Sequence, residues 1–301
     1  MSRSVTVGLD DSPESRAAAE WAAREALLRG LPLKIIYVWE PKSAYVARAP
    51  LLDLEKYQRW AEQLTHESAE GIRLRHPGIE VIAEKLTGTV ADILCEAAGS
   101  ADLLVLGSRG LGVVEGFLVG SVSLGVVARA ERPVVLVRAG EQAADEHEPT
   151  PAGVPSAAAR FRPVVVGFDI EAPDDTLLAF ALDAARRRGA PLRVVHAWPE
   201  PPASRYQSGG DVRLYDTLER GQASLLSKSL RPWRKKFPDV EVIEASRCGS
   251  APPILVNDSR DASLVVVGRR IRTSSFGAHI GHGTHAALHH IAAPVAVVAH
   301  S

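Results

Sequence analysis

The sequence predicts a duplicated α/β protein, in which each copy folds as a five-stranded parallel sheet flanked by helices. Three observations carry this prediction. Short runs of branched apolar residues alternate with longer stretches of helical character. Glycine, proline and helix-capping residues separate these runs. The whole pattern occurs twice along the 301 residues.

The first copy begins with Val5–Leu9, a short branched apolar run that predicts a buried strand. Ser12 is a good N-cap and Pro13 suits the first helical position, so a helix should begin there. This helix should end at Gly30, a residue that readily adopts the left-handed conformation after a helix.

The rest of the first copy continues the alternation of strand and helix. Thr89 and Asp92 are expected to form a capping pair at the start of the third helix, which has apolar residues on one face. The remaining expected elements, in chain order, are a strand over Leu33–Val38, a helix over 51–75, a strand over Val81–Glu84, a helix over 89–98, a strand over Leu103–Leu106, a helix from Ser121 and a strand over Val134–Val137.

The duplication is visible as matched residues that recur at a nearly constant spacing. A repeat of this length indicates a duplicated domain and not a solenoid. The matched pairs are Gly8 with Gly167, Trp39 with Trp198, Gly107 with Gly268, and Gly120 with Gly281.

The repeat divides the chain into a first domain over residues 1–138, a linker over residues 139–162 and a second domain over residues 163–301. The linker is rich in proline, acidic and small residues. That composition predicts an extended, mobile connection.

Composition limits the classes of function. The net charge of −1 argues against a protein that binds nucleic acid over its whole surface. No apolar run reaches the roughly 18 residues that a membrane helix needs, and the first residues lack a signal-peptide pattern. Cys95 and Cys248 lie far apart, as is usual in a reducing compartment. We therefore expect a cytoplasmic protein with no membrane association and no nucleic-acid partner.

The predicted topology places a ligand site at one edge of the sheet. In open parallel sheets, ligands bind beyond the carboxyl ends of the strands, where the strand order reverses direction. With the first strand in the centre, the loops after the first and fourth strands meet at this edge. The chemistry should therefore lie between Asp10 and the loop that begins at Gly107.

The loop from Gly107 to Ser123 is rich in glycine and ends at a predicted helix start. Glycine permits close approach of a ligand, and free N–H groups at a helix N-terminus bind phosphate. Arg109 would add a charge-assisted contact. A Walker loop is excluded because no lysine precedes Ser121, and a dinucleotide fingerprint because the glycines follow the fourth strand and not the first.

The spacing Gly107-x2-Gly110-x9-Gly120-Ser121, behind a first strand that ends Gly8-Leu9-Asp10, resembles the ATP-binding signature of universal stress proteins. The resemblance covers both copies and implies two tandem Rossmann-like domains. It implies ATP with Mg²⁺ across the ends of the first and fourth strands, with Asp10 near the ribose and the metal. The binding residues it implies are Gly8, Asp10, Val38, Gly107, Ser108, Arg109, Gly110, Gly120, Ser121, Val122 and Ser123.

The second copy has a degenerate glycine loop, although the spacing is kept. Ile271 stands where the first copy has Gly110, and His282 where it has Ser121. A β-branched residue is poorly suited to positive φ. The residues of the weaker second site would be Gly167, Asp169, Gly268, Arg269, Gly281 and Thr284.

These observations predict an ATP-binding regulatory protein of the stress response, with nucleotide held mainly by the first domain and with an unknown protein partner. Two alternatives stay open: a weak ATPase or phosphotransferase, and a partner-binding scaffold with a vestigial pocket. No set of residues argues for catalysis, because no lysine is placed for the phosphates and no base is positioned by a third group.

Two further expectations concern assembly and metals. The resemblance implies that the fifth strands, Val134–Val137 and Val295–Val298, pair within one chain, and a homodimer is also conceivable. His282, His285 and His289 would share one helix face, where a metal site is conceivable. We favour an ordinary polar helix face and predict no resident metal site.

Overall fold

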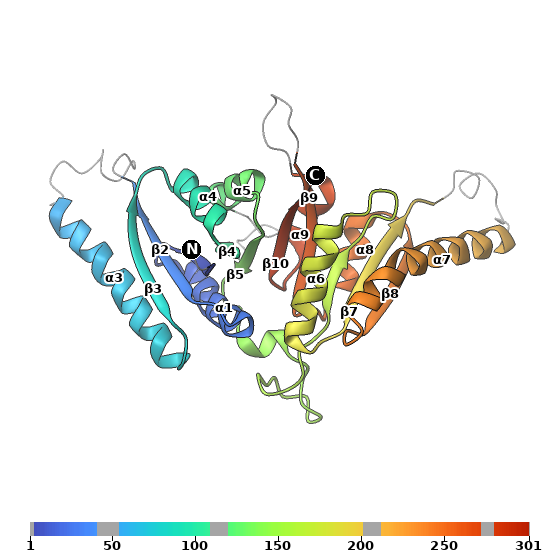
Figure 1. Cartoon of the computed structure of the whole chain (residues 1–301), viewed down its shortest axis with the longest axis horizontal. Coiled ribbons are helices and arrows are strands. Elements are labelled where there is room, and N and C mark those ends of the chain that lie inside the picture. Colours follow the sequence, from blue (N-terminus) through green and yellow to red (C-terminus); the bar gives the residue numbers. More distant parts are fainter. Residues whose placement is uncertain (1–2, 41–53, 109–119, 201–211, 272–279, 301) are drawn as a thin grey trace. The chain divides into compact units, whose positions relative to one another are not determined.

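The structure is a computed structural model that describes residues 3–40, 54–108, 120–200, 212–271 and 280–300. It divides into two compact units (Figure 1). The first consists mainly of Met1–Ala143, and the second of Ala144–Arg270 with Ile280–Ser301.

The first unit contains the predicted five-stranded parallel sheet, in the order β3-β2-β1-β4-β5 among the residues described. Its strands are buried along most of their length, as is typical of a parallel sheet covered on both faces. The elements are β1 (Val5–Leu9), α1 (Pro13–Arg29), β2 (Leu33–Trp39), α3 (Leu54–Arg75), β3 (Val81–Thr87), α4 (Val90–Ser100), β4 (Leu103–Ser108), α5 (Ser121–Arg129) and β5 (Val134–Arg138).

The second unit repeats this arrangement, with its described strands in the order β10-β9-β6-β7-β8 and all pairs parallel. Its elements are β6 (Val164–Gly167), α6 (Asp175–Arg188), β7 (Leu192–Trp198), α7 (Val212–Lys236), β8 (Val242–Cys248), α8 (Ala251–Asp258), β9 (Leu264–Arg270), α9 (His282–His290) and β10 (Val295–His300).

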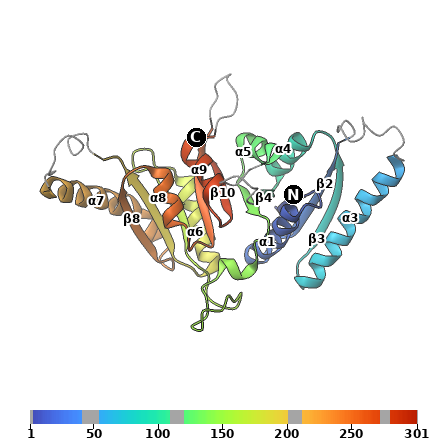
Figure 2. The ribbon, with the colours of Figure 1, turned by 180° about the vertical axis from the view of Figure 1, so that it is seen from behind.

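The helices of each unit lie in two layers, as right-handed crossovers require. In the first unit α1 packs beside α3 on one face of the sheet, and α4 packs beside α5 on the other. In the second unit α8 packs beside α9, and Figure 2 shows these two helices next to each other. The carboxyl ends of β1 and β4 therefore meet the first turns of α1 and α5.

Helix α1 begins and ends where the sequence predicts. The Ser12 hydroxyl accepts a hydrogen bond from the N–H of Ser15 at 3.1 Å, and Pro13 occupies the first turn. Gly30 has φ of 63°, the left-handed conformation predicted for it. Alanines at helical spacing, such as Ala18, Ala22 and Ala26, are buried and let the helix lie close against the sheet.

The predicted capping pair of α4 is wrong. Thr89 occupies the N-cap position, but its side chain makes no capping hydrogen bond. Asp92 instead forms an ion pair with Arg129 of α5, with 2.6 Å between oxygen and nitrogen. The tertiary partner from a neighbouring helix thus replaces the local partner that the sequence suggested.

The linker was expected to be extended, and this expectation is wrong. Ala143–Glu146 forms a 3₁₀ turn, and His147 forms an antiparallel bridge with Phe161. Two backbone hydrogen bonds close the ends of this segment, from Glu148 N–H to Arg160 O at 2.8 Å and from Arg162 N–H to Glu146 O at 2.9 Å. The aromatic contact between His147 and Phe161, with ring centroids 4.0 Å apart, buries the histidine.

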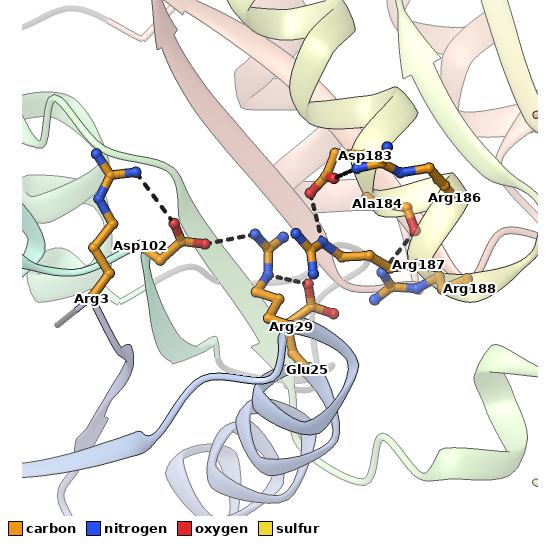
Figure 3. A network of polar contacts seen from close by, with 9 residues as sticks. All are labelled: Arg3, Glu25, Arg29, Asp102, Asp183, Ala184, Arg186, Arg187 and Arg188. Carbon is orange, nitrogen blue, oxygen red and sulfur yellow. Dashed lines mark hydrogen bonds and ion pairs between the residues drawn. The ribbon is translucent and has the colours of Figure 1, made fainter. Parts of the chain in front are cut away.

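A buried ion-pair cluster fixes the C-terminal end of α1 in the first unit (Figure 3). Arg29 donates to Glu25 one turn earlier and to Asp102 at the start of β4, both at 2.7 Å. The side chains of Arg29 and Glu25 are only 5% and 1% exposed. The burial of this pair means that each charge depends on the other for compensation.

The second unit has a local cluster of its own at the equivalent helix end (Figure 3). Asp183 of α6 accepts from Arg186 and Arg187, each at 2.7 Å. Arg188 donates to the carbonyl of Ala184. Cations at the end of a helix also suit its macrodipole.

Within the part of the chain that the structure describes, every helix is too short or too polar to cross a membrane.

Candidate functional site

A cavity of about 420 Å³ lies in the first unit at the carboxyl ends of β1 and β4. β1 has β2 on one side and β4 on the other, so the strand order reverses here. This is the position at which open α/β sheets bind ligands. Eight of the residues implied in the sequence line this cavity together: Gly8, Asp10, Val38, Gly107, Gly120, Ser121, Val122 and Ser123.

Three further residues of the implied set are not in this lining. Ser108 follows Gly107 in β4 and is buried, with 3% of its surface exposed. Since successive strand residues point to opposite faces, Ser108 and Gly107 cannot both face the cavity. Arg109 and Gly110 lie outside the described residues.

The N-terminus of α5 borders the cavity and presents backbone donors to it. The first hydrogen bond within this helix runs from the N–H of Leu124 to the carbonyl of Gly120, at 3.0 Å. The N–H groups of Ser121, Val122 and Ser123 therefore have no acceptor inside the helix. Their position at the positive end of the helix dipole suits an anion.

Ser123 has a structural role in addition to the predicted contact with phosphate. Its hydroxyl donates to the carbonyl of Gly107 at 3.0 Å, and only 8% of the residue's surface is exposed. This bond ties the first turn of α5 to the end of β4. The hydroxyl proton is thus used within the protein, while the backbone N–H of Ser123 still belongs to the free amides of the helix.

Gly107 and Gly120 differ in what a side chain would meet. A Cβ atom on Gly107 would lie 2.6 Å from the backbone carbon of Glu14, so the first turn of α1 packs directly on this glycine. A Cβ atom on Gly120 would meet nothing within 4 Å among the residues that the structure describes. Gly120 also has φ of −62°, which any residue adopts. Packing therefore requires a glycine at 107, whereas at 120 the open space is what a bound ligand would use.

Asp10 lies at the rim of the cavity and is held by the start of α1. Its Oδ1 accepts from the hydroxyl of Ser12 at 2.5 Å and from the N–H of Ser12 at 3.1 Å. Partial burial opposes ionisation of this carboxyl, but hydrogen bonds from Ser12 and Ser15 outweigh burial and lower the pKa of Asp10 below its ordinary value. Asp10 is therefore a carboxylate at neutral pH.

The cavity also has lining residues that sequence reasoning did not select. Apolar side chains come from β2, α4 and β4, among them Ile36, Leu94 and Leu106. Ser12 and Ser15 come from the first turn of α1. The predicted N-cap at Ser12 was the available signal, because the start of α1 must lie at the same sheet edge as the end of β1. Nothing in the sequence marked the apolar wall, since its residues have the pattern of ordinary core.

No group of three or more histidine, cysteine or acidic side chains among the described residues is arranged to hold a metal. In α9, His285 and His289 lie ring against ring with centroids 4.2 Å apart. Asp10 is one carboxylate that would contribute to a magnesium ion whose other ligands are phosphate oxygens and water, the usual arrangement for this ion.

A second cavity of about 690 Å³ lies at the equivalent sheet edge of the second unit. Four of the six residues predicted for the weaker second site line this cavity: Gly167, Asp169, Gly268 and Thr284. Arg269 is buried and lies outside this lining, because it follows Gly268 in the strand. Gly281 is also absent from the lining, whereas Gly283, two residues later, is part of it.

The second unit repeats the connection between helix and strand. The hydroxyl of Thr284 donates to the carbonyl of Gly268 at 2.7 Å, as Ser123 does to Gly107. The first intrahelical bond of α9 runs from His285 N–H to the carbonyl of Gly281 at 2.8 Å. The frame of the site is therefore kept, and the differences between the two cavities lie in their side chains.

The comparisons with known proteins agree with this architecture. The model of the universal stress protein family matches residues 1–138 and 160–299. A universal stress protein of Mycobacterium tuberculosis is 32% identical over 314 residues, which covers 97% of this chain and 94% of the relative. A universal stress protein of Mycolicibacterium smegmatis is 30% identical, with 98% and 96% covered. The crystal structure of a universal stress protein from Archaeoglobus fulgidus aligns with a TM-score of 0.69 at 17% identity, over 99% of this chain and 98% of that one.

Proposed function

The chain belongs to the universal stress protein family, and we propose that its first unit binds an adenine nucleotide, ATP with Mg²⁺, as a regulatory ligand. The observation that carries the proposal is the meeting of two features at one sheet edge. The amides of Ser121, Val122 and Ser123, which have no acceptor within the helix, border a cavity, and among the described residues nothing lies beside Gly120 where phosphate would approach.

The lining of the cavity includes both apolar and polar groups, as a nucleotide requires. Apolar residues, including Ile36 and Leu94, line the wall that would receive the adenine, and the backbone of Val38 would offer it hydrogen bonds. Asp10 lines the same cavity, and its carboxylate would bind the ribose hydroxyls or the magnesium ion. Magnesium would supply charge neutralisation of the phosphates.

The charge state of the lining supports binding and does not favour hydrolysis. A general base at neutral pH needs a pKa near 7, and the shift at Asp10 is in the opposite direction. The other carboxyl side chain of the described lining is that of Glu14, beside Gly107. We therefore propose that occupancy of the cavity changes the affinity for a protein partner in a stress response, with slow hydrolysis as the alternative.

Calorimetric titration of nucleotide-free chain with ATP–Mg²⁺ tests this proposal, using Gly120→Val. The valine side chain would occupy the space beside the free amides, so we expect the affinity of the first site to fall by at least about tenfold. Gly281→Val is the matched control. Gly281 has the same capping geometry, and a Cβ atom added there would also meet none of the described residues within 4 Å, so the variant loses the same glycine N-cap in the other unit.

The expected result is a loss of the first-site affinity in Gly120→Val and its retention in Gly281→Val. Hydrogen exchange of β1 and β4 checks that Gly120→Val keeps its fold. An unchanged affinity in a folded Gly120→Val chain would overturn the site assignment.

A further inference from the structure

We propose that the C-terminal part of α7 binds the phosphate backbone of duplex DNA without preference for its sequence. The proposal goes beyond nucleotide binding in the first unit and does not depend on it. It rests on a difference in charge between the end of α7 and the matching end of α3. The surface, which we call the α7 cation patch, consists of four exposed residues: Lys228, Arg231, Lys235 and Lys236.

The ends of α3 and α7 correspond to each other, as one pair of contacts shows. Each helix carries an arginine that donates to the first carbonyl of the strand that follows it. In the first unit Arg73 donates to the carbonyl of Val81 at 2.6 Å. In the second unit Arg234 donates to the carbonyl of Val242 at 3.1 Å. The charges of the two helix ends can therefore be compared position by position.

Acidic and apolar positions of α3 are basic in α7. The matched pairs are Glu67 with Lys228, Glu70 with Arg231, and Leu74 with Lys235. The three residues of α7 are three and four positions apart, so they share one face of the helix. One exposed helix face thus carries positive charge where its counterpart in the first unit carries acids and a leucine.

The first unit neutralises the cations at the end of α3, and the second does not do so in α7. Arg73 forms an ion pair with Glu70, and Arg75 forms one with Glu20 of α1. Ala179 stands in α6 at the position of Glu20, so that acid is missing from the second unit. Within the described part of the chain, no cation of the α7 cation patch forms an ion pair.

Aromatic rings hold one end of the patch in place. Trp233 and Phe237 are stacked with ring centroids 6.3 Å apart. The ammonium of Lys236 lies over both rings, 5.0 Å from the centroid of Trp233 and 5.9 Å from that of Phe237. The guanidinium of Arg186, from α6, lies 5.3 Å from the centroid of Phe237. A cation–π contact positions a charge without cancelling it.

The composition of the patch favours a nucleic acid over a membrane or a protein. A helix that binds a membrane surface inserts its apolar face into the lipid. That face of α7 is already used inside the unit, since Leu226, Leu230 and Phe237 are buried. Protein interfaces are depleted in lysine, whereas lysine and arginine are the usual partners of backbone phosphates.

The geometry of the patch favours a duplex over a single strand. At about 1.5 Å per residue, Lys228 and Lys235 lie about 10 Å apart along the helix. About three phosphates of one duplex strand occupy this length, at about 3.4 Å each. Single-strand binding also uses aromatic rings on which bases stack. Here Lys236 covers the ring of Trp233, which is also stacked with Phe237.

We expect the binding to be weak, because the patch is small and acids lie close to it in the sequence. Asp239 and Glu241 follow the end of α7, and the net charge of −1 gives no attraction over the whole surface. Non-specific DNA binding has a dissociation constant of about 10⁻⁴–10⁻⁶ M at physiological salt. Four phosphate contacts predict a slope of about −3 to −4 when the logarithm of the association constant is plotted against that of the salt concentration.

Fluorescence anisotropy of a short labelled DNA duplex, titrated with the full chain between about 50 and 200 mM salt, tests the proposal. Lys228→Glu with Arg231→Glu places acids where α3 has them, so the fold should tolerate the change. This double variant should lower the affinity at least about tenfold and bring the slope to about −2. Lys235→Gln, a milder change, should make the slope shallower by about one.

The matched control is Arg220→Glu with Arg270→Glu, which changes two exposed arginines of the second unit outside the patch. Its net charge equals that of the first double variant, so an effect of net charge alone would be the same in both. We expect the control to lower the affinity by less than about threefold. Circular dichroism and thermal unfolding check that all variants fold.

Equal loss of affinity in the two folded double variants would overturn the proposal, as would the absence of binding at about 50 mM salt. A single strand of the same sequence, vesicles that contain phosphatidylglycerol and a polyglutamate peptide are titrated in parallel. Tighter binding of any of these three than of the duplex would also overturn it, because the patch would then serve a single strand, a membrane or an acidic protein.

Discussion

Gly107→Ala should destabilise the first unit more than its counterpart Gly268→Ala destabilises the second. A Cβ atom at 107 would lie 2.6 Å from the backbone carbon of Glu14 and 2.8 Å from its oxygen, whereas ordinary contacts begin at 3.4 Å. The neighbour is helix backbone, so α1 must move. Overpacking of this kind costs about 1–3 kcal/mol. The gain from replacing glycine in a strand offsets about 0.5–1 kcal/mol, so we expect a net loss of about 1–2 kcal/mol.

At position 268 the closest atom to an added Cβ would be Nε2 of His300, at 2.7 Å. This atom is the end of a side chain that can rotate, so the same substitution should change stability by no more than about 0.5 kcal/mol. Urea unfolding with hydrogen exchange of β1 and β9 measures the two units separately. Equal destabilisation of the two units, or an unchanged first unit in Gly107→Ala, would refute the packing argument.

Other predictions concern single interactions of the first unit. Ser123→Ala removes the bond to the carbonyl of Gly107 and should lower the free energy of unfolding by about 1 kcal/mol in urea titrations; no loss would mean that this bond contributes nothing. The lowered pKa of Asp10 means that its stabilisation is present above the ordinary pKa and is lost as pH falls through the folded pKa. Asp10→Asn should therefore make acid unfolding less steep, and identical pH profiles would contradict this. Glu25→Ala leaves Arg29 buried with Asp102 as its remaining carboxylate partner in this cluster. The midpoint of thermal unfolding should therefore fall by an amount equivalent to about 2–3 kcal/mol. A change below about 0.5 kcal/mol would show that the pair contributes little.

Much of the fold follows from local signals in the sequence. Ser12, Pro13 and Gly30 fix the ends of α1 because their preferences are intrinsic to the backbone. Strand ends were predicted less well: β3 continues to Thr87, three residues beyond the expected Glu84. The last residues of β3 alternate between charged, apolar and polar side chains and are partly exposed. They remain in the strand because they pair with β2 up to Trp39.

The linker and α4 show where local signals fail. Proline and acidic residues between the copies predicted an extended chain, but Glu141 of that segment accepts two hydrogen bonds from Arg24 of α1. That partner is far away in the sequence, so no local pattern announces it. The same is true of Asp92, which pairs with Arg129 of another helix and does not cap its own.

The sequence predicted which segments line the cavity of the first unit, but it did not predict what each glycine does there. The topology places Asp10, Gly107 and the start of α5 together, because parallel strands end at one edge. The sequence did not distinguish the packing role of Gly107 from the open position of Gly120, since both are glycines of one pattern. The pairing of the fifth strands and a cytoplasmic location stay predictions.

In the proposed function, the amides at the start of α5 hold the phosphates of a nucleotide. The most direct measurement is the NMR shift of the backbone N–H groups of Ser121, Val122 and Ser123 during titration with ATP–Mg²⁺. We predict large shifts of these three amides that saturate with the same dissociation constant as the calorimetric binding. Binding of ATP–Mg²⁺ without any shift of these amide resonances would show that the phosphates do not lie at the start of α5.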